Sequence, residues 1–143
     1  MSNEEATRRA VASPHWRWMP GMSTQNHGRV IEGNGIAVID RDGALVAPAL
    51  NRQWSVPAQT VSALPDLDDP ATMGCLLALV REAVEPNRAP GDWPMVCTYQ
   101  SQGKKWGVGA WLNESGKATF AALVLPTYET ESAALVAALE AAP

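Results

Sequence analysis

The chain has 143 residues, 46% of them hydrophobic and 18% charged, with a net charge of −4. This composition excludes wholesale disorder, and the length allows one domain of ordinary size that needs no covalent cross-links. Residues 1–60 carry six Arg against five acids, and residues 61–143 carry five basic against ten acidic residues, so the halves are +1 and −5. Neither half has the basic surface expected of a protein that binds duplex nucleic acid.

The two cysteines, Cys75 and Cys97, match no CxxC or metal-ligand spacing, so we expect buried free thiols in a reducing cytoplasm. The opening MSNEEATRRAVASPHW lacks the apolar core of a signal peptide, and the longest apolar run, near 74–80, is too short to span a bilayer. The prediction is a soluble, cytoplasmic protein that makes no contact with a membrane.

The first part of the chain predicts a flexible start followed by strands. Residues 1–15 hold acidic and basic residues at helical spacing but little apolar surface, so a short frayed helix in a mobile segment is expected. Turn residues at 33–35 and 41–43 predict tight hairpins. Residues 16–63 are therefore predicted to form an antiparallel β-meander and a connection, with short strands at 16–19, 29–32, 36–40 and 44–47 and a further one near 53–56.

Residues 64–143 predict a helix, three strands and a second helix. Asp69 suits a helix N-cap and Pro70 the first helical position, and an apolar stripe continues to Pro86. Strands are expected at 95–100, 105–112 and 118–125, and the last helix at 128–142. The predicted fold class is α+β: an N-terminal antiparallel β-meander, then a helix, a three-stranded antiparallel sheet and a C-terminal helix, in one compact domain.

The middle strand of that sheet has two unequal faces. Trp106, Val108 and further apolar residues alternate with Gly107, Gly109 and Trp111. Because side chains alternate along a strand, one face is well filled, whereas the other has gaps beside a lone indole.

No arrangement of residues predicts a catalytic centre, a metal site or a cofactor. The two histidines, His15 and His27, lie in turn-rich sequence without further ligands at zinc spacing. No serine lies in a nucleophile-elbow pattern, and no glycine-rich phosphate loop precedes a helix. The helix, three strands and helix share the topology of a double-stranded RNA-binding domain, but the last helix begins Tyr-Glu-Thr-Glu at 128–131, where such a domain has lysines.

Tryptophan is the residue that composition singles out, since six Trp stand beside one Phe and two Tyr. Trp and Arg together can hold a nucleotide, through guanidinium to phosphate and indole to base, or form a protein-binding hot spot. The alternative is that the indoles fill the hydrophobic face of a small sheet. The candidate ligand-binding residues are Trp16, Arg17, Trp18, Arg29, Arg52, Trp54, Trp106 and Trp111.

Two segments, LPDLDDPATMGCLLALVREA (64–83) and ESAALVAALEAAP (131–143), resemble recurrent boxes of small uncharacterised proteins of tailed bacteriophages and prophages. Many of these also carry an opening similar to WRWMPGM at 16–22. The chain departs from them at Ser132-Ala133, where an acidic-alanine repeat is usual. The resemblance supplies no catalytic residues; it implies an accessory phage protein that is made in a bacterial cytoplasm and often acts by binding.

The leading hypothesis is a non-enzymatic phage accessory binding protein with a counter-defence role. It would sequester a nucleotide-type immune signal or block a host defence protein. One alternative is a homo-oligomeric structural or assembly protein in which exposed sheet edges pair between chains. A second alternative is a small enzyme with an unrecognised site, for which His15 or His27 would be the first candidates.

Overall fold

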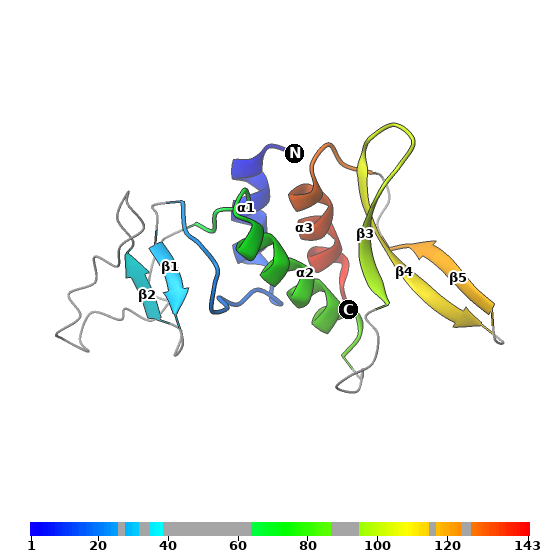
Figure 1. The fold of residues 1–143 in the computed structure, drawn as a ribbon, viewed down its shortest axis with the longest axis horizontal. Coiled ribbons are helices and arrows are strands. Elements are labelled where there is room, and N and C mark those ends of the chain that lie inside the picture. The colour runs from blue at the N-terminus through cyan, green and yellow to red at the C-terminus, as the bar shows by residue number, and fades with distance from the viewer. Residues whose placement is uncertain (26–27, 32–34, 39–63, 87–94, 115–116, 124–126) are drawn as a thin grey trace. The chain divides into compact units, whose positions relative to one another are not determined.

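The computed structural model describes residues 1–25, 28–31, 35–38, 64–86, 95–114, 117–123 and 127–143 (Figure 1). The helices in these ranges are α1 (Asn3–Ala12), α2 (Pro70–Val84) and α3 (Glu131–Ala141), and the strands are β1 (Gly28–Ile31), β2 (Gly35–Val38), β3 (Val96–Gln100), β4 (Trp106–Glu114) and β5 (Lys117–Ala122). The contacts divide the chain into two compact units. Unit 1 comprises residues 1–16 and 76–143, and unit 2 comprises residues 17–75.

Unit 1 begins with a helix. The Ser2 hydroxyl accepts a hydrogen bond from the Glu5 N–H at 3.2 Å and so caps the start of α1. Ala6, Thr7 and Ala10 are buried along one side of the helix. The predicted N-terminal β-meander is therefore wrong, because the chain opens with a helix whose small side chains lie in a core.

α1 packs against α3, although the two helices are the first and last elements of the described chain. The Ser132 hydroxyl donates to Asn3 Oδ1 at 3.0 Å, and Arg9 Nε donates to Glu140 Oε1 at 2.8 Å. A second Arg9 nitrogen also bonds the Glu140 carboxylate, and these hydrogen bonds raise the pKa of Arg9. Where the sequence favoured a mobile start at 1–15, the structure has a docked helix held by small residues and polar contacts.

α3 is buried around its whole circumference. The Thr130 hydroxyl caps it by accepting from the Ala133 N–H at 3.2 Å, and every residue from 132 to 139 is buried. α1 and strands β3 and β4 contact α3. The small alanine side chains of α3 let α1 and the sheet approach it closely.

β3, β4 and β5 form an antiparallel sheet in that order, as the sequence predicted. Its register places Val96 opposite Ala110, and Trp111 opposite Phe120. Val96, Val108 and Ala110 are buried on the side that carries α3.

α2 begins at Pro70, as predicted, because Asp69 Oδ2 accepts the Thr72 N–H at 2.8 Å. The Thr72 hydroxyl donates to the same carboxylate oxygen at 3.0 Å and accepts the Ser23 N–H at 2.8 Å. Within unit 2 this network joins the start of α2 to residues 22–25. In the segment before α2, the Asp66 N–H also donates to the Ser23 carbonyl at 2.8 Å. Unit 2 also buries the apolar side chains of Trp18, Met22 and Leu67.

The strand predicted at 16–19 is also wrong. The structure assigns no strand there, and the Met22 N–H closes a turn onto the Met19 carbonyl at 3.1 Å around Gly21, whose φ is +98°. Strands β1 and β2 form an antiparallel hairpin where two strands were predicted, at 29–32 and 36–40. The strands predicted at 44–47 and 53–56 lie outside the described residues.

Within the described ranges, no helix combines the length and the apolar character needed to cross a membrane.

Candidate functional site

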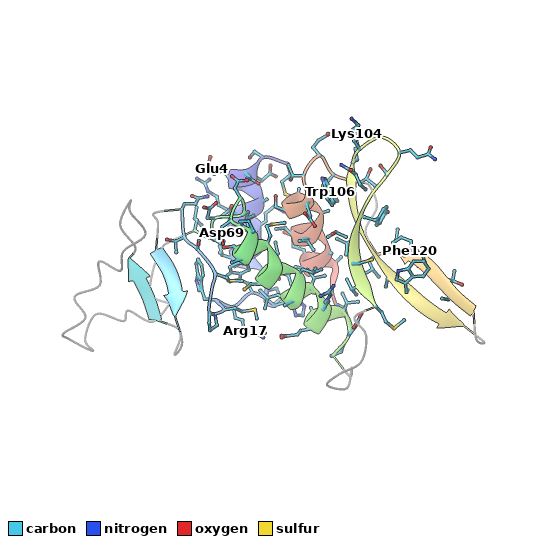
Figure 2. All side chains as sticks on the ribbon, viewed as in Figure 1. Glu4, Arg17, Asp69, Lys104, Trp106 and Phe120 are labelled. Carbon is cyan, nitrogen blue, oxygen red and sulfur yellow. The ribbon has the colours of Figure 1, made fainter. Side chains whose placement is uncertain are left out.

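The side of the three-stranded sheet that faces away from α3 carries a cluster of aromatic rings. Residues opposite each other in an antiparallel sheet share a face, so the register groups Tyr99, Gly107, Gly109, Trp111 and Phe120. We call this set the aromatic face. Figure 2 shows Phe120 on this side of the sheet and Trp106 on the side of α3.

Two glycines of β4 make room for the rings. A Cβ atom at Gly107 would lie only 2.5 Å from Cζ of Tyr99, and one at Gly109 would overlap the ring of Phe120. The rings of Tyr99 and Phe120, from the flanking strands, therefore lie directly over the backbone of β4. Glycine within a strand often marks such a close approach, and a neighbouring ring that covers it restores the packing that the missing side chain would supply.

The three rings of the aromatic face hold each other in a fixed arrangement. Tyr99 and Phe120 are edge-to-face, with ring centroids 5.1 Å apart and an interplanar angle of 89°. Phe120 and Trp111 are 5.2 Å apart at 61°. Each pair contributes about 0.5–1.5 kcal/mol beyond its buried area. A ligand that docks on the face meets rings whose positions are already set.

Trp111 is the exposed member of the cluster. Its side chain is 49% exposed, whereas Tyr99 and Phe120 are half-buried. An indole that only filled the hydrophobic face of a small sheet would be covered, so this exposure separates Trp111 from a core tryptophan.

The sequence identified Trp111 but missed Tyr99 and Phe120. It predicted gaps on this face beside a lone indole, and the structure fills those gaps with rings from β3 and β5. The available signal was the spacing of Gly107, Gly109 and Trp111, which share one face. It could not name the covering rings, because they depend on the register of two other strands.

The residues predicted at 16–18 do not form a strand face. Trp16 is half-buried just after α1, where its backbone N–H donates to the Ser13 carbonyl at 3.0 Å. Arg17 is exposed, and Trp18 is only 9% exposed and belongs to the core of unit 2. A buried indole offers no surface for stacking, so Trp18 serves the fold.

The remaining predicted residues, Arg29, Arg52, Trp54 and Trp106, lie elsewhere in the chain. Arg29 lies in β1 opposite Ala37, but its side chain lies outside the described structure, as do Arg52 and Trp54 entirely. Trp106 is half-buried, and its backbone exchanges hydrogen bonds of 2.6 and 2.7 Å with Tyr128. Of the predicted residues whose side chains are described, only Trp111 lies on the aromatic face.

A hollow of about 460 Å³ lies at the end of α2 and is lined by Ala78, Arg81, Glu82, Glu85 and Pro86. Two of its charged side chains already bind the backbone of β3. Arg81 Nε donates to the Val96 carbonyl at 2.9 Å, and Glu85 Oε1 accepts the N–H groups of Met95 and Val96 at 3.0 and 2.9 Å. The charges of this hollow thus hold the strand in place.

The titratable groups offer no competing site in the described ranges. No three His, Cys, Asp or Glu residues come together there as metal ligands. Burial, with a smaller effect of the Asp69 carboxylate, raises the pKa of the Cys75 thiol. Cys75 therefore stays protonated at neutral pH and is a poor nucleophile.

No protein-family model, curated protein or solved structure matches this chain. The resemblance to phage proteins therefore stays a hypothesis, and function has to be argued from the geometry of the site.

Proposed function

We propose that this chain is a non-enzymatic binding protein that takes a planar, nucleotide-type ligand on its aromatic face. The observation that carries the proposal is the half-exposed indole of Trp111, held edge-on to Phe120 on the side of the sheet away from α3. We further propose that the protein acts for a phage against a host defence, by sequestering a nucleotide signal. This part is supported by the resemblance of residues 64–83 and 131–143 to phage proteins.

The chemistry of the face favours a ligand with an aromatic ring. Stacking of a base on an exposed ring contributes about 1–3 kcal/mol and depends little on which base is bound. The net charge of −5 over residues 61–143 disfavours long polyanions such as duplex nucleic acid. A small nucleotide carries fewer charges and suffers less from this repulsion.

Isothermal titration calorimetry tests the proposal with cyclic and ADP-ribose-type nucleotides as probes. For a nucleotide that binds the wild-type protein, we expect Trp111→Ala to weaken binding at least about ten-fold, which corresponds to about 1.4 kcal/mol, and Trp111→Phe to retain part of the affinity. Because Trp111 is half-exposed, both variants are expected to fold, which circular dichroism can verify.

Arg17→Ala is the matched control, because Arg17 is an exposed residue of the site that the sequence predicted. The proposed site predicts unchanged affinity for this variant. If Arg17→Ala abolishes binding and Trp111→Ala does not, the ligand site lies with the residues around 17 and the aromatic face is the wrong choice.

A host defence protein is the second possible target, since exposed tryptophan is also typical of protein hot spots. Pull-down from a bacterial lysate with the wild-type protein and with Trp111→Ala distinguishes this outcome. A host protein retained by the wild type and lost by the variant would move the proposal from a nucleotide to a protein ligand. No binding in either assay would refute the binding role itself.

A further inference from the structure

The three-stranded sheet has two edges, and the β3 edge is blocked at Val96. The Met95 carbonyl accepts the backbone N–H of Trp111 at 2.9 Å. Successive residues of a strand point their backbone groups to opposite sides, so the N–H and C=O of the next residue, Val96, point away from β4. Glu85 and Arg81 bind both of these groups, at 2.9 Å each. The two side chains occupy the place of a further strand at this point and prevent another chain from pairing there.

Among the described residues, no side chain covers the β5 edge in this way. The Leu123 N–H donates to the Val108 carbonyl at 2.8 Å, so the odd-numbered residues of β5 bond to β4. The N–H and C=O groups of Ala118, Phe120 and Ala122 therefore point to the outer side. No hydrogen bond connects these groups to another residue in the described ranges, and Ala118 and Ala122 are exposed.

A row of unpaired backbone groups is a template for another strand, and proteins commonly protect it with charge, proline or a bulge. From Lys117 to Leu123, β5 and its next residue contain no proline and carry a single charge, at Lys117. Two copies placed antiparallel would put the two Lys117 charges at opposite ends of the interface. A parallel arrangement would put them side by side, so the charge favours an antiparallel pair.

One register uses all the open groups. When Phe120 lies opposite Phe120 of a second copy, Ala118 lies opposite Ala122 at both ends. All three outward-pointing residues then exchange both of their hydrogen bonds with the other chain, because they become hydrogen-bonded pairs of the antiparallel ladder. The two phenylalanines become cross-strand neighbours on one face, an arrangement that stabilises sheets by about 0.2–1 kcal/mol per pair.

We infer that two copies of this chain pair through β5, antiparallel and centred on Phe120. The resulting six-stranded sheet joins two aromatic faces into one surface. The inference rests on the open edge of β5 and goes beyond the proposed ligand binding, which requires only one copy.

Sedimentation equilibrium of the full chain tests this inference. The wild-type protein is expected to form a species of twice the chain mass of 15.3 kDa. The double variant Ala118→Lys/Ala122→Lys places Lys opposite Lys at both ends of the interface and is expected to weaken dimerisation at least ten-fold. The matched control Ala118→Glu/Ala122→Lys places Glu opposite Lys at both ends and should preserve the dimer or strengthen it.

Both double variants change the same two exposed positions, so they affect the isolated chain similarly. Within one chain residues 118 and 122 pair with the uncharged Asn113 and Gly109. They are also about 13 Å apart along the strand, so their mutual interaction is weak. Circular dichroism verifies that both variants fold.

A wild-type protein that stays monomeric at high micromolar concentration would overturn the inference. So would a dimer that both double variants weaken equally, or that neither weakens, since the interface or its register would then be different. Calorimetry with nucleotides on the wild-type protein, at a concentration where sedimentation shows only monomer, keeps the two proposals apart: ligand binding by the monomer leaves the proposed function standing even if the dimer is absent.

Discussion

Strand β4 has two faces that are covered in different ways. On one face, Val108 and Ala110 are buried beneath α3. On the other, Gly107 and Gly109 are covered by the rings of Tyr99 and Phe120, and Trp111 remains half-exposed. The first face gains stability from exclusion of water by a helix, whereas the second leaves apolar surface exposed.

The largest effect is expected from a substitution that creates a cavity on the helix side of the sheet. Leu139 of α3 is fully buried, so Leu139→Ala removes its contacts and leaves space that the neighbouring helix and sheet only partly fill. We expect a loss of about 2–5 kcal/mol in the free energy of unfolding, measured by urea denaturation. A loss below that of Trp111→Ala would contradict the assignment of the helix side as the stabilising face.

On the aromatic face, Gly109→Ala is expected to destabilise the protein by about 1–3 kcal/mol, because the new methyl group overlaps the Phe120 ring. Combining it with Phe120→Ala should cost less than the sum of the two single changes, since the overlap is then gone. Urea denaturation of the four proteins gives the coupling energy. Strict additivity would show that the ring does not rest on Gly109.

Glu85→Ala tests the blocked β3 edge of the sheet. It removes the carboxylate that accepts the N–H groups of Met95 and Val96, and we expect a loss of about 1–2 kcal/mol in unfolding free energy. Hydrogen exchange should show faster exchange of these two amides. Unchanged protection at Met95 and Val96 would mean that the carboxylate does not hold the edge.

For Trp111→Ala we expect a loss of about 1–2 kcal/mol in the free energy of unfolding, because the side chain is half-exposed and its removal costs one ring pair, with Phe120. Thermal unfolding followed by circular dichroism measures it. A small loss of stability together with a large loss of ligand binding would mark the indole as a binding residue. A large loss of stability would assign it to the core.

The sequence predicted the elements that depend on local chemistry. Asp69 and Pro70 start a helix through a side-chain cap and a fixed φ, and both effects act within a few residues. The hairpin of β1 and β2 and the antiparallel order of β3, β4 and β5 also follow from nearby turn residues and alternation. Such features need no knowledge of the rest of the chain.

What the sequence could not predict depends on distant contacts. α1 has little apolar surface, and its burial arises because the equally small residues of α3 let it approach closely. Nothing in the sequence around Trp18 distinguishes it from an exposed tryptophan, and its burial results from packing within unit 2. The aromatic face needs the registers of two strand pairs, so its three rings are separated in sequence and adjacent in space.

The pairing of α1 with α3 has a consequence for how the protein is made. Arg9 and Glu140 are 131 residues apart in sequence, and α1 packs against a helix that leaves the ribosome late. During synthesis α1 therefore lacks its partner α3. Because a helix of ten residues with few apolar side chains is marginal in water, α1 is not stable by itself at that stage. The core of unit 1 closes only after translation has delivered α3, so a nascent chain stalled before residue 131 would leave the apolar side of β3 and β4 open to chaperones and proteases.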